Sequence, residues 1–138
     1  MPEYRITDDT ATEVLELLGR DQEDIYAVLG YQLRGIDEPP SRLQIGERVE
    51  IPKANLISNG MKFFEQILPK LKKVICEDWK FCERQKELLD DTEKLVKELI
   101  PVVAAAGITV FGALIPQATL IVVVALAIKY GLKALCGC

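Results

Sequence analysis

The sequence predicts an α+β chain, in which a small N-terminal βααβ module precedes a mainly α-helical region with a C-terminal transmembrane helix or helical hairpin. Three observations predict this fold. The net charge changes from −6 in residues 1–60 to zero in residues 61–98 and +2 in residues 99–138. Apolar pairs recur every seven residues in the middle of the chain, and thirty consecutive residues carry no charge. We expect five segments: a module at 1–53, a linker at 54–60, a helical region at 61–98, an apolar membrane segment at 99–135 and a cysteine-containing tail at 136–138.

The N-terminal module is predicted from short apolar patterns separated by breaks. Tyr4–Ile6 alternates like a strand. Asp8–Leu18 has apolar residues on one face and a capping residue at its start, which predicts a helix. Gln22–Tyr31 has the same pattern after a glycine break. Leu43–Ile51 alternates again, and Pro52 is expected to end that second strand.

Both ends of this module resemble a known family. Tyr4-Arg5-Ile6 followed by Asp8-Asp9-Thr10 is similar to the opening strand and Gly-Asp-Thr turn of the LysM family. Ile45–Pro52 is similar to the closing strand of that family. The resemblance implies a βααβ fold over residues 3–53 and a groove that binds a GlcNAc-containing glycan or a protein partner. By position, the resemblance places the groove at Asp9, Thr10, Ala11, Gly30, Tyr31 and Leu33.

A seven-residue repeat runs through residues 61–98. Its first apolar positions are Ile67, Val74, Phe81, Leu88 and Leu95. A sustained period of seven predicts a narrow seam that faces another helix. Two interpretations stay open: the seam packs on the N-terminal part of its own chain, or it joins copies of the chain in a homo-oligomer. Pro69 and the Asp90-Asp91-Thr92 stretch are expected to interrupt the helix, the latter with a cap.

The uncharged stretch at residues 99–128 predicts a membrane segment. As one helix it would be about 45 Å long, whereas the hydrocarbon core of a bilayer is about 30 Å thick. Pro116 therefore either kinks one span, best placed at 108–128, or marks the turn between hairpin arms at 102–114 and 119–130.

Six residues shape this predicted membrane segment. A proline at the start suits a first helical turn, glycines permit close helix packing, and a Lys-Tyr pair at the end is typical of a membrane interface. These residues are Pro101, Gly107, Gly112, Pro116, Lys129 and Tyr130.

The cysteines and the absence of histidine limit the chemistry that we expect. Cys76, Cys82, Cys136 and Cys138 are too few and too clustered to indicate a secreted disulfide framework. Cys76 and Cys82 would lie about 120° apart on a helix, so they would need a bend to hold one ion. We expect no metal site and no cofactor. The chain has no histidine, the commonest general base, and no catalytic motif stands out, so we expect no enzyme activity.

These patterns predict a non-catalytic, membrane-associated protein. A LysM-like docking domain would be coupled to a membrane-inserting, self-assembling helical segment that acts as an anchor or as a holin- or toxin-like pore. One alternative is a peptidoglycan- or chitin-binding protein tethered by its tail. Another is a soluble helical assembly component that buries the apolar hairpin between subunits. The acidic first sixty residues argue against nucleic acid. The N-terminus has no signal-peptide pattern, which places the N-terminal domain in the cytoplasm.

Overall fold

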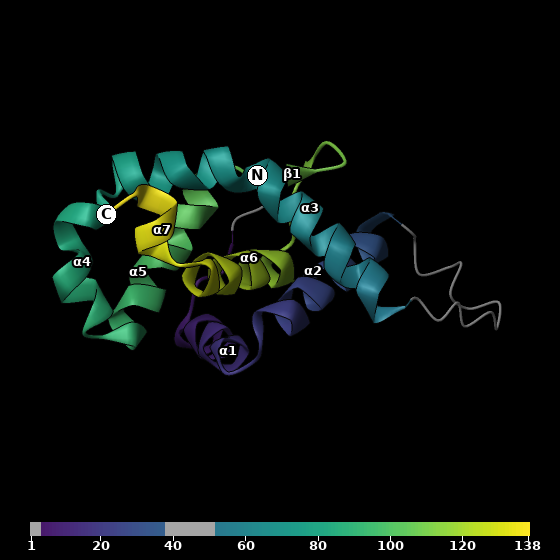
Figure 1. The fold of residues 1–138 in the computed structure, drawn as a ribbon, viewed down its shortest axis with the longest axis horizontal. Helices are drawn as coiled ribbons and strands as arrows, with labels where there is room; N and C mark the ends of the chain where they lie inside the picture. The colour runs from purple at the N-terminus through teal and green to yellow at the C-terminus, as the bar shows by residue number, and fades with distance from the viewer. Residues whose placement is uncertain (1–3, 38–51) are drawn as a thin grey trace.

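The structure, a computed structural model, describes residues 4–37 and 52–138. Within these ranges the chain is mainly helical, and its sheet is a single two-stranded hairpin. The elements are α1 (Asp8–Leu18), α2 (Gln22–Asp37), α3 (Lys53–Lys72), the π-helix η2 (Lys73–Asp78), α4 (Phe81–Leu89), α5 (Thr92–Ala105), β1 (Thr109–Val110), β2 (Ala113–Leu114), α6 (Gln117–Tyr130) and α7 (Leu132–Cys136). Figure 1 shows α6 in the middle of the molecule, with the other helices around it.

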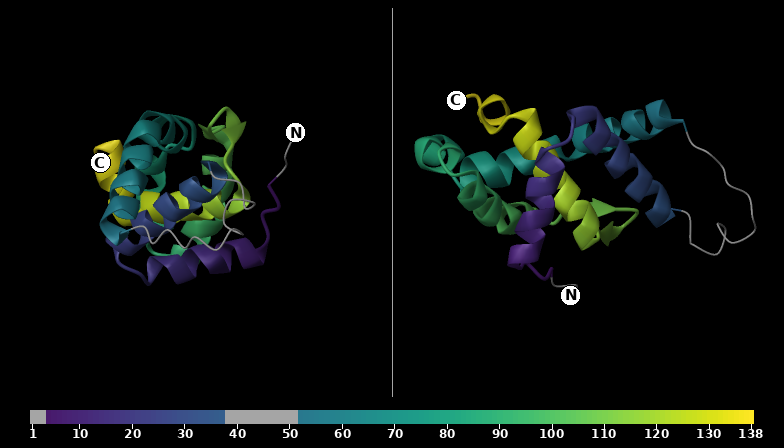
Figure 2. Two further views of the ribbon diagram at one scale, coloured as in Figure 1. Left: turned by 90° about the vertical axis from the view of Figure 1, so that its right-hand side faces the viewer. Right: turned by 90° about the horizontal axis from the view of Figure 1, so that it is seen from below.

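Helix α6 is the centre of the hydrophobic core. Its residues from Thr119 to Ala127 are all buried, because the helix is apolar on every side. Helices α1, α2, α5 and α7 pack against it, and the two further views in Figure 2 show the same central position. These surrounding helices are amphipathic, so their apolar faces cover α6 and their charged faces point outward.

The predicted membrane segment is therefore wrong. No helix in residues 4–37 and 52–138 combines the length and the apolar character that crossing a bilayer requires. The uncharged stretch is divided among the end of α5, the β-hairpin and α6. At 14 residues, α6 is about 21 Å long, well below the hydrocarbon thickness of about 30 Å. The predictions of a membrane-associated location and of an anchor or pore function rested on that segment, so they are wrong as well.

The hairpin between α5 and α6 was expected to be helical. Gly107 adopts a φ of +63°, just after α5 ends. The next residues include three β-branched side chains, which favour extended backbone. Phe111 and Gly112 then form a two-residue turn in which both φ values are positive, 53° and 80°. Pro116 is the N-cap residue of α6. It neither kinks a single helix nor forms the turn between two helical arms.

The N-terminal βααβ module is also wrong as a fold. The two helices are confirmed, and α2 runs on to Asp37. Tyr4–Ile6, however, does not pair as a strand. Instead the Gln117 side chain accepts a hydrogen bond from the Arg5 backbone N–H and donates one to the Arg5 carbonyl, both at 2.8 Å. This segment is thereby tied to the start of α6. The second predicted strand, Leu43–Ile51, lies outside the described residues.

Helices α2 and α3 approach each other at two glycines. A Cβ atom at Gly30 would lie 2.0 Å from the carbonyl oxygen of Leu56, and one at Gly60 would lie 2.1 Å from that of Tyr26. Each glycine therefore contacts the backbone of the opposite helix, and only the absence of a side chain permits this distance. The predicted linker at 54–60 is part of α3, and it supplies half of this contact.

The middle region is interrupted at Lys80 and at Asp90–Asp91, whereas the interruption expected at Pro69 does not occur. Pro69 lies inside α3, which continues into the π-helix η2. Lys80 then adopts a left-handed conformation and redirects the chain into α4. The predicted cap at the next break is confirmed, because the Asp91 carboxylate accepts a hydrogen bond of 3.1 Å from the backbone N–H of Lys94 at the start of α5.

Candidate binding pocket

A pocket lies where α2, α3 and the end of α6 meet. Its volume is about 390 Å³, which is within the range of small-ligand sites. Three aromatic rings form one wall. The Phe64 ring lies between the other two, with ring centroids 5.9 Å from Tyr26 and 5.8 Å from Tyr130. The residues that line the pocket are Gln22, Glu23, Tyr26, Ile57, Met61, Phe64, Glu65, Leu68 and Tyr130.

The floor of the pocket is rigid, whereas its mouth is open to solvent. Phe64 is 1% exposed and Tyr26 8%, so both rings are held by the core. Tyr130 and Met61 are each 41% exposed. A wall of this kind combines fixed aromatic faces with side chains that can adjust to a ligand.

The charge of the pocket is negative. Glu23 and Glu65 are exposed carboxylates in its lining, and none of the nine lining residues is a lysine or arginine. Burial raises the pKa of the Tyr26 hydroxyl, and the neighbouring Tyr130 and Glu65 push the pKa in the same direction. Gln22 opposes this shift by donating a hydrogen bond of 3.2 Å to the Tyr26 oxygen. An ionised tyrosinate is thus disfavoured here, and Tyr26 is a neutral aromatic surface at physiological pH.

The glycine contact between α2 and α3 positions this wall. Tyr26 is the residue whose carbonyl oxygen contacts Gly60, and Phe64 lies one helical turn after Gly60 on the same helix. The close approach of the two backbones therefore sets the spacing between the Tyr26 and Phe64 rings.

A second cavity of about 240 Å³ lies between α1, α2 and α6. It has no aromatic lining, and it contains Arg20 beside Glu13 and Glu16, so its charges are partly compensated within the chain. The Oε1 atom of Gln32, which lines it, is buried without a hydrogen-bond partner. We therefore regard the aromatic pocket as the stronger candidate for ligand binding.

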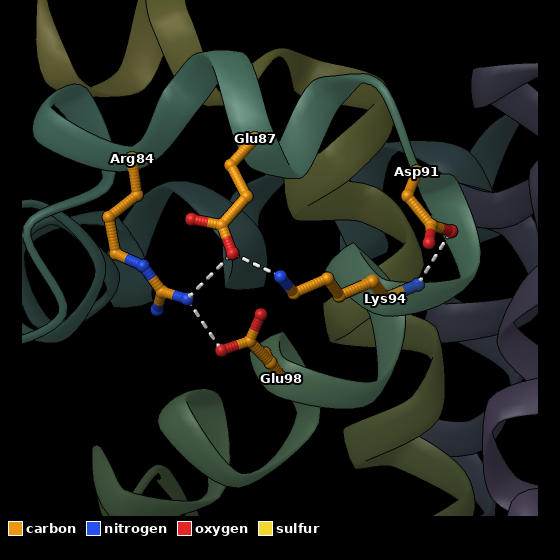
Figure 3. Close-up of polar contacts among 5 residues, drawn as sticks. All are labelled: Arg84, Glu87, Asp91, Lys94 and Glu98. Atoms are coloured by element: carbon orange, nitrogen blue, oxygen red, sulfur yellow. Dashed lines mark hydrogen bonds and ion pairs between the residues drawn. The ribbon is translucent and has the colours of Figure 1, made fainter.

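A cluster of charged residues joins α4 to α5, as Figure 3 shows. Arg84 donates a hydrogen bond of 2.8 Å to Glu98 and lies 3.9 Å from Glu87. Lys94 donates a hydrogen bond to the same Glu87 oxygen. Arg84 also lies over the Trp79 ring, 5.8 Å from its centroid. Each carboxylate and each cation in this cluster has an opposite charge nearby. The cluster therefore connects two helices, and we do not regard it as a catalytic site.

This cluster predicts a pH dependence of stability. The hydrogen bond and charge of Lys94 hold the pKa of Glu87 below its usual value, which in unfolded chains is about 4.3. Glu87 therefore stabilises the fold fully above its unfolded pKa, and this contribution is lost as the pH falls through the lowered folded pKa. We expect Glu87→Gln to reduce the loss of stability in acid, measured by urea unfolding at pH 6 and at successively lower pH.

Glu83→Gln is the matched control for this prediction. Glu83 lies on the same helix, is exposed, and has no ion pair among the described residues. It is expected to leave the pH profile as it is in the wild type. An identical profile for Glu87→Gln and the wild type would contradict the interaction.

The residues that the LysM resemblance proposed do not form a groove. Asp9, Thr10 and Ala11 occupy the start of α1, where the Thr10 hydroxyl donates to the Arg5 carbonyl at 3.1 Å. The others lie in the second half of α2, where Gly30 faces the α3 backbone, Leu33 is buried and Tyr31 is 66% exposed. None of the six lines either cavity.

The structure separates the residues that were assigned to the membrane segment. Pro101 is an exposed residue within α5, and Lys129 is exposed near the end of α6. Gly107 and Gly112 lie at the bends described above, and Pro116 is the N-cap residue of α6. Tyr130, expected to anchor the chain at a membrane interface, instead forms one side of the aromatic pocket.

The five seam positions belong to the core of the single chain. They are Ile67, Val74, Phe81, Leu88 and Leu95, all buried, and they are distributed over α3, η2, α4 and α5. These positions pack within the chain, but only α3 and α5 lie against the N-terminal helices α2 and α1, whereas α4 packs on α5, α7 and η2. These side chains are not available to form a contact between copies.

The cysteines form disulfides, contrary to the expectation from their spacing. Cys76 is bonded to Cys136, and Cys82 to Cys138. Together the two bonds attach α7 and the C-terminus to η2 and the first turn of α4. The sequence pattern could not indicate this pairing, because it depends on how the end of the chain returns to the middle.

The aromatic wall was also missed. Tyr26 and Phe64 lie on the apolar faces of two helices, and aromatic residues in such positions usually belong to the core. Only the position of Tyr130, beside them and half-open to solvent, distinguishes a pocket from packing. A scan against protein-family models, a search of curated proteins and a search of solved structures each found no match to this chain.

Proposed function

We propose that this protein is a non-catalytic binding module that holds a basic side chain of a partner polypeptide in its aromatic pocket. The observation that carries the proposal is the combination of three aromatic rings with two carboxylates and no cation in one lining. A lysine or arginine has an apolar stem and a positive end, so both parts of this lining are complementary to it.

The two parts of the pocket contribute different interactions. A cation within about 6 Å of an aromatic face is stabilised by about 0.5–2 kcal/mol, depending on its exposure. Glu23 and Glu65 add an attraction that is screened by salt, because both are exposed. Met61 and Leu68 supply apolar surface for the stem of the side chain.

Peptide binding provides the test. A short peptide with alternating lysine, arginine and small neutral residues is titrated into the full chain, and heat or NMR shifts are measured. A matched peptide with glutamine at each basic position is expected to bind more weakly or not at all. Binding of the basic peptide is expected to weaken as ionic strength rises.

Two substitutions locate the binding to the pocket. Tyr130→Ala is expected to lower the affinity for the basic peptide about five- to tenfold, the equivalent of roughly 1–1.4 kcal/mol of binding free energy. Glu65→Gln is expected to weaken binding less, and to reduce its salt dependence. Both residues are exposed enough for replacement without disturbing the core.

Matched controls exist on the same chain. Tyr31 is 66% exposed on α2 and lies outside the pocket, so Tyr31→Ala is expected to leave binding unchanged. Glu83→Gln removes a carboxylate on α4 that does not line the pocket, so it is also expected to leave binding unchanged. Equal binding of the glutamine peptide, or an equal loss in Tyr31→Ala and Tyr130→Ala, would exclude this function.

A further inference from the structure

The four cysteines meet at one end of the molecule, where the C-terminus lies beside α4 (Figure 1). The Cα atoms of Cys76 and Cys136 are 5.4 Å apart, and those of Cys82 and Cys138 are 5.9 Å apart. Only Gly137 separates the two tail cysteines. The Sγ atom of Cys82 also lies 3.9 Å from the carbonyl oxygen of Cys136, the residue bonded to Cys76. The two disulfides therefore join neighbouring positions of the tail to η2 and α4, and we call these four residues the cysteine cluster.

The backbone departs from regular helix where it brings these cysteines together. On a continuous α-helix Cys76 and Cys82 would lie about 120° apart. Here Cys76 lies in the π-helix η2, Lys80 adopts a left-handed φ of 57°, and Cys82 lies in the first turn of α4, which begins at Phe81. Gly137, with a φ of 72°, bends the tail in the same way. π-helical turns and left-handed non-glycine residues occur often at functional sites, and here they supply the bend that the cysteine spacing needs.

In the disulfide-bonded form, no group of three or more histidine, cysteine, aspartate or glutamate side chains in residues 4–37 and 52–138 is arranged to hold a metal ion. We propose that the reduced protein binds one Zn²⁺ through the thiolates of Cys76, Cys82, Cys136 and Cys138, which makes the cluster a redox-switched metal site. Tetrahedral Zn–S bonds of about 2.3 Å place the four sulfurs about 3.8 Å from one another. Bonded sulfurs lie about 2 Å apart, so the two sulfurs of each reduced pair would have to separate by about 2 Å, which side-chain rotation permits at Cα separations of 5.4 and 5.9 Å.

The chemistry of the switch balances with a dithiol as the reductant. Each disulfide takes two electrons and two protons from one dithiol, which itself becomes a disulfide. Two dithiols thus produce four protein thiols. Zn²⁺ then displaces the four thiol protons and forms four Zn–S bonds. A small-molecule disulfide reverses the sequence: for each pair of cysteine thiolates that it oxidises it takes two electrons and is itself reduced to two thiols, and Zn²⁺ is released because sulfur in a disulfide is no longer a thiolate ligand.

Charges of both signs lie near the cysteines in the sequence, with Glu77, Asp78 and Glu83 on the acidic side. Four thiolates and one Zn²⁺ carry a net charge of −2. Lys80 lies in the chain between Cys76 and Cys82, and Lys133 lies one helical turn before Cys136.

The experiment uses the full chain, reduced by a dithiol under anaerobic conditions, freed of reductant and titrated with Zn²⁺ alone. We expect one Zn²⁺ per chain, the release of protons on binding, and protection of the four thiols from alkylation. Co²⁺ in place of Zn²⁺ is expected to show the intense thiolate-to-metal charge-transfer absorption of a sulfur-ligated site. The oxidised chain is expected to bind neither ion.

Variants separate this site from other ligands and from an unfolded chain. Cys136→Ser with Cys138→Ser is expected to weaken Zn²⁺ binding at least about a hundredfold, more than a change near the ligands would. Glu77→Gln with Asp78→Asn, which removes the carboxylates between Cys76 and Cys82, is expected to leave the affinity within about threefold. Denaturing urea is expected to weaken binding by the reduced wild type at least about tenfold, because an unfolded chain does not preform the cluster.

Three results would overturn the proposal. The first is no stoichiometric binding by the reduced chain. The second is equal affinity with and without the tail cysteines. The third is equal affinity in urea and in buffer, which would assign binding to flexible thiols rather than to this fold.

Discussion

Replacing Gly60 with alanine is expected to lower the free energy of unfolding by about 3 kcal/mol. The new Cβ atom would lie 2.1 Å from the Tyr26 carbonyl oxygen, and a backbone atom cannot rotate away as a side chain does. The two helices must therefore separate, at the upper end of the cost of overpacking a core, about 1–3 kcal/mol. Gly30→Ala, with its Cβ 2.0 Å from the Leu56 carbonyl oxygen, is expected to lower the free energy of unfolding by the same amount.

Urea unfolding followed by far-UV circular dichroism measures this effect, and Gly35→Ala is its control. Gly35 is on α2, as is Gly30, but a Cβ there would meet nothing within 4 Å. Because alanine favours a helix by up to about 1 kcal/mol over glycine, Gly35→Ala is expected to be neutral or stabilising. The close backbone contact would be refuted by Gly60→Ala unfolding at the urea concentration of the wild type.

The same substitution links packing to the proposed function. Separation of α2 from α3 would move the Tyr26 ring away from the Phe64 ring, since these residues flank the glycine contact. Gly60→Ala is therefore expected to weaken basic-peptide binding even under conditions where the variant is folded. Gly35→Ala is expected to bind as the wild type does.

Removal of both disulfides is expected to lower the free energy of unfolding by at least about 4 kcal/mol, and removal of one, with the other still in place, by less. The bonds join residues 60 and 56 positions apart, and closing a loop of this length restricts the unfolded chain by about 4 kcal/mol. For a chain of this size, the loss of both bonds would lower the thermal midpoint by roughly 15 °C. The two loops cover nearly the same segment, so the second bond adds less than the first and the losses do not sum.

Paired serine substitutions provide the measurement, since they leave no unpaired thiol. Cys76→Ser with Cys136→Ser and Cys82→Ser with Cys138→Ser are each compared with the wild type by thermal unfolding, with a metal chelator present. A dithiol is expected to lower the midpoint of the wild type and to leave a four-serine variant unchanged. Detection of four reactive thiols in the unreduced wild type would contradict the disulfides.

Local signals in the sequence were reliable where short-range physics decides the structure. The apolar face and start of α1 predicted its bounds, and Asp91 was expected near the cap that it forms for α5. Capping and amphipathic patterns act within one or two helical turns, so neighbouring residues suffice to predict them. The heptad positions were also identified as packing residues, although their partner was left open.

Long-range contacts decided what these signals could not. The strand at Tyr4–Ile6 failed because its hydrogen bonds go to Gln117, far away in the sequence. The disulfide pairs could not be predicted for the same reason, because each joins residues more than fifty positions apart. The pocket required Tyr130 to reach two rings on helices from the other half of the chain. None of these partners is determined by the local pattern around the residue.

The sequence by itself determined that most of residues 99–128 must leave water, because exposing a long, mainly apolar stretch is unfavourable. The tertiary structure decided where they go. Gly107, Phe111 and Gly112 divide the stretch with a hairpin, and the remaining helix α6 is about 21 Å long. The amphipathic helices α1, α2, α5 and α7 then bury it within the chain. A hydrophobic stretch indicates that its residues will be buried. Whether lipid or protein then surrounds them depends on how much of the stretch the rest of the chain can cover.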